Sequence, residues 1–556
     1  MSRRLANRRI RLLVVVFTIA FASLLVRAAW LQGVQARTLD RLARGQHREV
    51  VSLPARRGTI YDRTGLQLAI GEQATTVYAD PRQVRDPRRV ALAAGKTLGV
   101  DPLKLFRRLQ DRSRAFVYLR RQADPERAAA LRRRHLLGVG FYPEERRTYP
   151  QGSVAAQVVG YAGVDNQGLA GLELGLDRLL AGRPGRQTIV KDPFGRVIDV
   201  IGATREQAGH DVYLTLDHTV QANVEGILRG AVRRWRARAA TAVVLDPRNG
   251  DVLAMANAPT FDANAFPRIY PPLQRNRAVE ATYEPGSTLK VVTVAGALSE
   301  RLVTPRSSFN LPPVLHVADR EISDAEERDW ETMTVAQIVA QSSNVGAVTL
   351  AQLLGSSRLS RWIARFGFGR KTGVDFPAES PGIVPPVARW SGSTIGTLPI
   401  GHGIAVTPIQ MAAAYAAVGN RGILVQPHLV ERVAGLPRGR PKRRRVLTNG
   451  VAAQLRAMLR GVVLEGTGQL ARVPGYQVAG KTGTAAKPDP EGGYSDSKYV
   501  ASFVGLVPAS KPRLVILVAI DEPKGAIFGG IVAAPVFQDI ARFALPYFEV
   551  PPDGRR

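Results

Sequence analysis

The sequence predicts a mixed α+β protein in three parts: a single N-terminal transmembrane helix, an α+β module, and a domain in which helices flank a central antiparallel sheet. Three observations support this prediction. An apolar run, Leu12 to Val26, follows a cluster of arginines. Two pairs of apolar strands, within 241–256 and 500–520, begin and end the C-terminal half, each around a turn that contains proline. The pattern between these hairpins is helical, so we expect the terminal strands to form one sheet beside a helical lobe.

The amino terminus has the charge pattern of a membrane anchor. The arginines before the apolar run are Arg3, Arg4, Arg8, Arg9 and Arg11. Arg27 and Trp30 follow it, and these residue types suit the membrane interface. We expect an anchor over 12–32, a cytoplasmic tail over 1–11 and an exported remainder. A cleavable signal peptide ending near Ala20-Phe21-Ala22 and a buried core helix are the alternatives, but the apolar run continues past that cleavage pattern.

Composition narrows the classes of function. The chain has 556 residues and no cysteine, which excludes disulfides, thiolate metal sites and thiol catalysis. Its formal net charge of +31 raises nucleic acid as a partner. The arginines are scattered through every segment, however, and no helix-turn-helix, zinc-finger or RNA-binding pattern accompanies them. We therefore expect no nucleic-acid partner, and an anionic membrane or cell wall as the surroundings.

Residues 33–215 are predicted to form a second, separate module. Short β-type runs there alternate with charged, helical stretches. The run Thr59-Ile60-Tyr61-Asp62 indicates a strand that enters a turn, and 124–137, rich in Arg and Ala, indicates an exposed helix. The segment has no nucleophile–base pair and no metal-ligand spacing, so alone it indicates only an extracytoplasmic α+β module.

The C-terminal half is organised around Glu284-Pro285-Gly286-Ser287-Thr288-Leu289-Lys290. Ser287 stands at the start of a helix and Lys290 follows three residues later, so the two side chains share one helical face. The helix continues from Val291 to Leu298 and is apolar on nearly every side, which indicates burial. A hydroxyl beside an amine on a rigid, desolvated element predicts covalent catalysis with Ser287 as nucleophile and Lys290 as base.

Two further motifs can complete such a site, because acyl transfer needs a proton relay, an oxyanion hole and a group that holds substrate charge. Ser342-Ser343-Asn344 interrupts a helical pattern with a predicted N-cap at Thr334 and C-cap at Gly355, so Ser342 and Asn344 can face a cleft. Lys481-Thr482-Gly483-Thr484 is predicted to be an edge strand. It offers an ammonium, hydroxyls and backbone N–H groups, and Gly483 lets a ligand approach the main chain.

Each short pattern occurs a second time, and context decides between the copies. Ser495-Asp496-Ser497-Lys498 lies in a loop-like stretch with no helix to hold it. Ser308-Phe309-Asn310 runs into prolines, and Lys371-Thr372-Gly373 follows a stretch interrupted by glycines. The first set is the one in which every motif has a suitable local structure.

A serine–lysine set of this kind is the signature of penicillin-binding proteins and class A β-lactamases. The chain resembles a class B penicillin-binding protein from near its amino terminus to Phe537. In the non-catalytic domain the resemblance rests on Arg57-Gly58-Thr59-Ile60-Tyr61-Asp62-Arg63-Thr64-Gly65, Arg147-Thr148-Tyr149-Pro150-Gln151-Gly152 and Gly168-Leu169-Ala170-Gly171-Leu172-Glu173. In the catalytic domain it rests on Arg275-Asn276-Arg277-Ala278, Glu284-Pro285-Gly286-Ser287 and Gly529-Gly530-Ile531-Val532-Ala533-Ala534-Pro535-Val536-Phe537.

Within this family the sequence is similar to the division-type branch. Asn276-Arg277-Ala278 with Glu284-Pro285 resembles that branch, whereas elongation-type relatives usually carry Pro-Pro before the Gly-Ser. Two positions depart from the family pattern: Gln157 replaces a common histidine, and Glu280-Ala281 replaces a common Thr-Asp. Neither position belongs to the catalytic set.

The resemblance implies that residues 33–215 form an elongated, non-catalytic α+β pedestal domain of the dimerisation type. It also implies, over 216–548, a serine β-lactamase/transpeptidase-like domain with a five-stranded antiparallel sheet, followed by a tail over 549–556. It implies a D,D-transpeptidase that cross-links peptidoglycan stem peptides at the division septum and is acylated by β-lactams. Lys290, with a pKa lowered by desolvation and by Lys481, would take the proton of Ser287.

The resemblance also implies roles for the remaining site residues. Backbone N–H groups of Ser287 and Thr484 would hold the oxyanion. Ser342 would relay a proton to the leaving D-alanine, and Asn344 would hold the amide of the donor peptide. Lys481, Thr482 and Thr484, on the strand that includes Gly483, would bind the terminal carboxylate. No metal or cofactor is required.

The implied location is the bacterial cytoplasmic membrane at the septum, with the catalytic domain outside. The implied partners are a polytopic septal glycosyltransferase and other divisome membrane proteins. Several alternatives stay open. An elongation-type transpeptidase would differ in its partners, and a D,D-carboxypeptidase or β-lactamase would deacylate with water. A non-catalytic assembly scaffold or a β-lactam sensor is a different class of function, although about eleven residues before the apolar run leave little room for a cytoplasmic effector.

Overall fold

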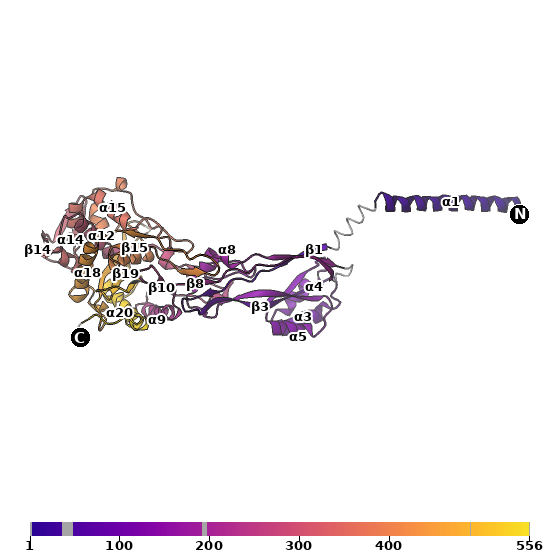
Figure 1. Ribbon diagram of the computed structural model, residues 1–556, viewed down its shortest axis with the longest axis horizontal. Coiled ribbons are helices and arrows are strands. Elements are labelled where there is room, and N and C mark those ends of the chain that lie inside the picture. The colour runs from indigo at the N-terminus through magenta and orange to yellow at the C-terminus, as the bar shows by residue number, and fades with distance from the viewer. Residues whose placement is uncertain (1–2, 36–47, 192–196, 490, 555–556) are drawn as a thin grey trace. The chain divides into compact units, whose positions relative to one another are not determined.

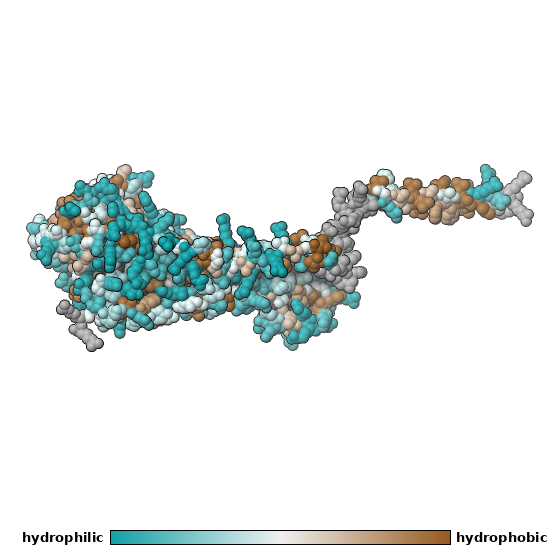
Figure 2. Space-filling view, in the orientation of Figure 1, coloured by the Kyte–Doolittle hydropathy of each residue, from teal (hydrophilic) through white to brown (hydrophobic). Residues whose placement is uncertain are grey.

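The computed structural model describes residues 3–35, 48–191, 197–489 and 491–554. Its first element is helix α1 (Arg3–Gly33), whose surface is mostly apolar in Figure 2. Among the described helices, one is long and apolar enough to cross a membrane, over the 27 residues Asn7–Gly33. The predicted anchor, 12–32, lies inside it.

The chain forms two compact units, and the smaller one comprises residues 1–56 and 182–208. Besides α1 it contains a three-stranded antiparallel sheet in the order β1-β6-β7. Its strands are β1 (Arg48–Leu53), β6 (Gly185–Lys191) and β7 (Val197–Thr204). Strands far apart in the sequence thus meet, since Val50 of β1 is opposite Thr188 of β6.

The larger unit comprises residues 57–181 and 209–556 and includes a six-stranded sheet. The sheet runs in the order β16-β8-β2-β3-β4, and β5 also pairs with β3. Its strands are β2 (Ile60–Tyr61), β3 (Gln67–Ala79), β4 (Val117–Ala123), β5 (Val139–Thr148), β8 (Val212–Leu214) and β16 (Val430–Val433). Because β16 comes from the C-terminal half, the pedestal sheet continues directly into that half.

Three helices beside β3 begin in the same way: α3 (Pro87–Leu98), α4 (Pro102–Gln110) and α5 (Pro125–Arg132) (Figure 1). Each begins at the proline of an Asp-Pro pair, and the aspartate before it accepts hydrogen bonds from backbone N–H groups of the first turn. The helix expected over 124–137 is α5, which ends earlier than expected, at Arg132. There His135 has φ of +46°, which a right-handed helix does not allow.

A buried ionic network joins the three pedestal motifs. Arg57, fully buried, contacts Glu173 at 2.6 Å and Asp177 at 2.7 Å. Glu173 also accepts a hydrogen bond from Nε of Arg147 at 2.6 Å. Since an unpaired buried charge is costly, these residues depend on one another. The two acids lie on short helices, Glu173 on α7 (Gly171–Gly175) and Asp177 on α8 (Asp177–Leu180), and a third short helix, α6 (Ala156–Val159), contacts α7.

The C-terminal half is built on a five-stranded antiparallel sheet in the order β10-β9-β20-β19-β18. Its strands are β9 (Ala239–Leu245), β10 (Val252–Ala258), β18 (Ala479–Pro488), β19 (Tyr494–Val507) and β20 (Leu514–Asp521). Both predicted hairpins are present, and β20 pairs with β9, so the terminal strands close one sheet as expected. The predicted fold class is confirmed.

Both faces of this sheet are covered by helices. On one face Val244 and Ile516 pack with α9 (His218–Arg234) and α20 (Ala534–Tyr547), which lie side by side (Figure 1). On the other face Val243 and Leu517 pack with α12 (Lys290–Ser299), α17 (Pro408–Gly419) and α18 (Asn449–Leu464). Adjacent residues of one strand therefore enter opposite cores, as the strand period of two requires.

The remaining elements connect these layers. The other helices are α10 (Pro271–Gln274), α11 (Arg277–Glu280), α13 (Val335–Ala340), α14 (Asn344–Leu354), α15 (Ser356–Phe366), α16 (Thr394–Thr397) and α19 (Gly529–Val532). The 3-10 turns are η1 (Ala263–Ala265), η2 (Gly286–Leu289), η3 (Val387–Arg389), η4 (Leu398–Ile400) and η5 (Gln469–Ala471). Three small antiparallel pairs are β11 (Ser308–Leu311) with β14 (Glu331–Thr334), β12 (Val314–Val317) with β13 (Arg320–Ser323), and β15 (Ile423–Val425) with β17 (Arg443–Arg445).

Candidate active site

Ser287 lies in the 3-10 turn η2, directly before α12, so the helix predicted from the sequence begins as a tighter turn. The turn packs on the backbone of edge strand β18. Gly286 has φ of +54°, and a Cβ atom there would lie 2.7 Å from the carbonyl oxygen of Thr484. The backbone N–H of Lys290 donates to the carbonyl of Ser287. Glycine is thus required for the turn to approach the strand closely.

Lys290 joins the serine turn to the second motif. Its side chain is buried, and Nζ lies 2.7 Å from Oδ1 of Asn344 and 3.3 Å from Oγ of Ser342, and also donates to the carbonyl of Ser342. Ser287, Ser342 and Asn344 are half-buried and so remain accessible. The buried amine of Lys290 therefore contacts both predicted partners, Ser342 and Asn344, which remain accessible to a ligand.

The second motif forms the turn between α13 and α14, as the sequence predicts. Thr334 caps α13 with a full capping box, and Gly355 is the C-cap of α14. Ser342 has φ of +63°, an unfavourable backbone conformation for serine that directs the turn toward Lys290. Asn344 uses Oδ1 for Lys290 and Nδ2 for the carbonyl of Ser323 at 2.9 Å. One lone pair and one N–H of its amide remain for a ligand.

Asp324, which the sequence analysis did not identify, holds this turn in place. Its Oδ1 accepts hydrogen bonds from the N–H of Val345 at 3.0 Å, from Oγ of Ser343 at 3.2 Å, and from the N–H of Asn344. Its Oδ2 accepts from Nε of Arg328 at 2.6 Å. Asp324 lies in an ordinary acidic stretch about twenty residues upstream, so no local signal indicates its role.

The third motif lies on edge strand β18, again as predicted. The side chain of Lys481 is fully buried, and its Nζ lies 3.3 Å from Oγ1 of Thr482, which in turn lies 2.7 Å from Oγ1 of Thr467. Oγ1 of Thr484 accepts a hydrogen bond from the N–H of Gly529 at 3.1 Å. The O–H of Thr484 is therefore free to donate to a ligand, whereas the hydroxyl of Thr482 faces protein groups.

Gly483 has a packing role that differs from the expected one. A Cβ atom at this position would lie 2.4 Å from Oγ of Ser502 and 2.9 Å from the carbonyl oxygen of Pro285. Protein atoms of the neighbouring strand and of the serine turn occupy the space that a side chain would need. Glycine is needed here for β18 to pack against η2.

Burial controls the two lysines. It lowers the pKa of Lys290 to about 7, although the charge of Asp324 opposes this shift. Burial, together with the positive charge of Lys290, lowers the pKa of Lys481 well below its ordinary value. Repulsion between the two ammonium groups was expected to lower the pKa of Lys290. It lowers the pKa of Lys481 instead, and desolvation is what lowers the pKa of Lys290. A substantial neutral fraction of Lys290 at neutral pH makes it a competent base.

Glu284, just before the turn, forms a second network that the sequence analysis missed. Its Oε2 lies 2.9 Å from Nδ1 of His402. Its Oε1 accepts from the N–H of Gly403 at 3.0 Å and from the hydroxyl of Tyr494 at 3.1 Å. His402 also packs edge-to-face on Tyr494. These contacts attach the serine turn to the loop after η4 and to β19.

The second copies of the motifs have other structural roles. Thr372 donates to Glu379, whose carboxylate also accepts the N–H of Gly373 at 3.1 Å. The Ser308-Phe309-Asn310 copy forms most of β11. Ser495-Asp496-Ser497-Lys498 lies in β19 rather than in the expected loop, and the hydroxyl of Ser495 accepts from the backbone N–H groups of Ser497 at 3.4 Å and Lys498 at 3.2 Å.

Both departures from the family pattern are structural. Gln157 is buried, and its Nε2 donates to the carbonyls of Pro259 and Leu273 at 3.1 Å each. Glu280 accepts from the backbone N–H of Asn276 at 3.0 Å.

Over the described parts of the chain, no three His, Cys, Asp or Glu side chains gather as a metal site would require.

Comparison with known families and proteins gives a consistent result. The model described as "Penicillin binding protein transpeptidase domain" matches residues 240–542, and the model described as "Penicillin-binding Protein dimerisation domain" matches residues 52–214. The chain is 35% identical over 545 residues to the peptidoglycan D,D-transpeptidase FtsI of Escherichia coli K12, over 96% of this chain and 91% of that protein.

Other relatives extend the comparison. The chain is 35% identical over 572 residues to stage V sporulation protein D of Bacillus subtilis, over 99% of this chain and 88% of that protein. Its fold matches the crystal structure of penicillin binding protein 3 from Mycobacterium tuberculosis complexed with ampicillin. That match has a TM-score of 0.71 and 32% identity, over 91% of this chain and 98% of that one.

Proposed function

The chain belongs to the class B penicillin-binding proteins and is a D,D-transpeptidase of that type, and we propose that it cross-links peptidoglycan stem peptides at the division septum through an acyl-enzyme on Ser287. The observation that carries the choice of residues is the contact of buried Lys290, one turn after Ser287, with both Ser342 and Asn344. The amine of Lys290, three residues along the chain from the Ser287 nucleophile, is thereby placed within hydrogen-bond distance of the Ser342 hydroxyl.

In the first step Lys290 accepts the proton of Ser287, and Ser287 Oγ attacks the carbonyl of the penultimate D-alanine. A lysine with a pKa of about 7 can take this proton at neutral pH, which arginine cannot. The oxyanion is held by the backbone N–H groups of Ser287 and Thr484, which the close approach of Gly286 to β18 brings together. One such donor contributes ~3–4 kcal/mol to barrier lowering.

In the second step the C–N bond breaks and D-alanine leaves. Ser342, 3.3 Å from Nζ of Lys290, passes the proton to the leaving amine. Asn344 holds the amide of the donor peptide with the lone pair and N–H that its protein contacts leave free.

The terminal carboxylate of the donor binds at β18. The O–H of Thr484 donates to it, while Lys481 contributes positive charge from below. Thr482 acts through Lys481, because its hydroxyl contacts that ammonium and Thr467. Binding an anion raises the proton affinity of Lys481, so substrate itself favours its charged form.

The acyl-enzyme is then attacked by the amine of a second stem peptide, which forms the cross-link and releases Ser287. The same acylation residues would serve a D,D-carboxypeptidase, in which water replaces the amine. A product assay with a synthetic D-Ala-D-Ala peptide, with and without an acceptor amine, separates the two. We expect dimer with Ser287 intact and none with Ser287→Ala. If Ser287 yields only the shortened peptide even with acceptor present, the carboxypeptidase alternative is correct.

Glu284 supports the division-type assignment. It forms three hydrogen bonds around the serine turn, and a proline at this position, as elongation-type relatives usually have, could form none of them. Septal placement is tested with a fluorescent fusion of the full chain in dividing cells. A midcell band is expected, and uniform fluorescence along the lateral wall would indicate the elongation type.

The membrane arrangement follows from the same proposal. Residues 12–32 anchor the chain, the arginine-rich tail 1–11 lies in the cytoplasm, and the pedestal (33–215) and catalytic domain (216–548) lie outside. The anchor and pedestal contact a polytopic septal glycosyltransferase and other divisome proteins. Protease added to intact spheroplasts should digest the catalytic domain while leaving an amino-terminal tag intact.

A further inference from the structure

The catalytic domain has a concave site away from Ser287, and the charged lining of this site is almost entirely positive. The pocket has a volume of about 1030 Å³ and is bounded by α15, the loop after it, the start of α17, and β15 with β17. The cations that line it are Arg361, Arg365, Arg370, Lys371, Lys442, Arg443 and Arg444. All seven side chains are exposed to solvent.

This pocket is separate from the acylation site. Glu300, on its wall, directly follows the last residue of α12, whereas Lys290 is the first residue of that helix. A ten-residue helix is ~15 Å long, so the two sites lie near opposite ends of the buried helix α12. α17 also connects them, because Gln410 lines the pocket while the hydroxyl of Tyr415 donates to the carbonyl of Thr288 at 2.9 Å.

The positive charges in the pocket are not compensated by the protein. Among the residues the structure describes, none of the seven cations forms an ion pair, and the one carboxylate of the lining, Glu300, accepts a hydrogen bond from Nε1 of Trp362 at 3.1 Å. Partial desolvation by the pocket wall and the nearby charges of Arg365 and Arg370 lower the pKa of Arg444, although its side chain still reaches solvent. Like charges held this close repel one another, and a bound anion would relieve the repulsion.

Two of the arginines are held in place by the protein. Nε of Arg365 donates to the carbonyl of Val446 at 2.8 Å, and its guanidinium lies 5.2 Å from the centre of the Trp362 ring. Arg444 in turn donates to the carbonyl of Arg365. Each guanidinium keeps further N–H groups for a ligand, since arginine has five. Pre-positioned guanidinium groups lose less entropy on binding an anion than free side chains do.

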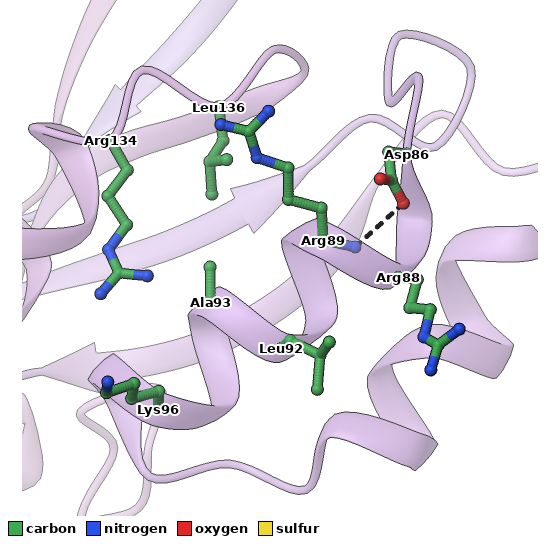
Figure 3. A pocket seen from close by; sticks show the side chains of 8 residues that line it. All are labelled: Asp86, Arg88, Arg89, Leu92, Ala93, Lys96, Arg134 and Leu136. Carbon is green, nitrogen blue, oxygen red and sulfur yellow. Dashed lines mark hydrogen bonds between the residues drawn. The ribbon is translucent and has the colours of Figure 1, made fainter.

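The pocket of the pedestal is a useful contrast. It has a volume of about 690 Å³ and also contains basic side chains, from α3 and the segment 134–136. Figure 3 shows that its charged groups spread around α3 instead of meeting, and that Asp86 caps the helix by accepting from the N–H of Arg89. It has fewer cations than the pocket between α15 and β17, and among its described residues it lacks guanidinium groups that backbone carbonyls hold in place as they hold Arg365 and Arg444.

We propose that the pocket between α15 and β17 binds an oligoanion, that is, a ligand with two or more phosphate or carboxylate groups along its length. Guanidinium groups bind both kinds of anion through paired hydrogen bonds. The volume is at the upper end of the ~300–1,000 Å³ typical of small-molecule sites, so one small anion would fill little of it. The concave shape favours such a ligand over a flat membrane surface.

The test is calorimetric titration of the full chain in neutral detergent with tripolyphosphate and, separately, with a hexaglutamate peptide. Inorganic phosphate is the comparison ligand, and each titration is run at low and high salt. The triple variant removes three cations whose side chains form no hydrogen bond that the fold requires: R361Q, K371Q and R443Q. The matched control removes three exposed arginines elsewhere in the domain: R233Q, R268Q and R542Q.

We expect at least one oligoanion to bind more tightly than phosphate, and the triple variant to weaken it ~10-fold or more, against less than ~2-fold for the control. The preferred oligoanion shows whether phosphates or carboxylates are the natural groups. Equal losses in both variants, or no oligoanion binding to the unaltered chain, would overturn the proposal. Binding to phosphatidylglycerol vesicles that depends on these residues, with no binding of either oligoanion, would also overturn the proposal. Labelled-penicillin acylation checks that each variant is folded, and the single reversal R443E replaces the triple variant if that one is not.

Discussion

Asp324 lies outside every motif, and we expect its substitution to alter the active site in two separable ways. Its side chain is 10% exposed and accepts from two backbone N–H groups and one hydroxyl of the turn that holds Ser342 and Asn344. Asp324→Asn keeps the shape and one acceptor oxygen but removes the charge. Asp324→Ala removes the acceptor as well.

The magnitude follows from the number of bonds. A hydrogen bond to a charged group contributes ~1.5–3 kcal/mol and a neutral one ~0.5–1.5 kcal/mol, so loss of charge weakens each of three bonds by ~1 kcal/mol. The turn then loses up to ~3 kcal/mol of local stability in Asp324→Asn. Since small displacements of catalytic groups cost up to ~100-fold in rate, we expect acylation to fall ~10-fold in Asp324→Asn and ~100-fold in Asp324→Ala.

The pH dependence supplies a second, independent readout. The charge of Asp324 raises the pKa of Lys290 against the larger effect of burial, which leaves it at about 7. Removing that charge lowers the pKa further, so Lys290 becomes a free base at lower pH. The acid limb of the acylation rate should therefore move to lower pH in Asp324→Asn. Stopped-flow acylation by a fluorescent penicillin between pH ~5 and ~9 measures both effects.

Asp329→Asn is the matched control, since Asp329 is a nearby acid that is exposed. It should leave the rate and the pH profile unchanged. An acid limb that moves to higher pH in Asp324→Asn, or a normal acylation rate in Asp324→Ala, would refute the role assigned to Asp324.

Three other substitutions test the remaining parts of the site. Lys290→Ala should lower the acylation rate by ~10²–10⁴-fold and abolish the acid limb near pH 7, and a residual rate with that limb intact would point to another base. Thr484→Val should raise the KM for a D-Ala-D-Ala peptide ~10-fold while acylation by saturating substrate changes less; an unchanged KM would rule out the carboxylate contact. Gly286→Ala should cost ~1–3 kcal/mol and lower the Tm, because of the left-handed φ and the contact with Thr484. Gly230→Ala in α9, where a Cβ meets no atom within 4 Å, should instead raise the Tm slightly, and equal shifts would contradict the packing argument.

Features set by neighbouring residues could be predicted from the sequence. Ser287 and Lys290 are three residues apart, and the capping residues Thr334 and Gly355 mark the helices around the second motif. The two hairpins are also local, because each pairs strands on either side of one turn. Local geometry was therefore sufficient to find the main elements of the catalytic half.

Features that depend on distant segments could not be predicted in this way. Asp324 reaches the second motif only after β13 folds back beside α14. His402 and Tyr494 contact Glu284 although they lie 118 and 210 residues from it in the sequence. The Ser495 copy was expected in a loop because its composition is polar. Strand β19 nevertheless continues to Tyr494, which pairs with Pro488 on β18 beyond an irregularity in the register, and this distant pairing overrides the local preference.

The measurement that tests the central claim most directly is mass spectrometry of the full chain after exposure to a labelled penicillin. We predict one covalent adduct per chain, on the peptide that contains Ser287, and its loss in Ser287→Ala but not in Ser495→Ala. An adduct that persists in Ser287→Ala, or that maps to the peptide containing Ser495, would contradict the assignment of Ser287 as the acylated nucleophile.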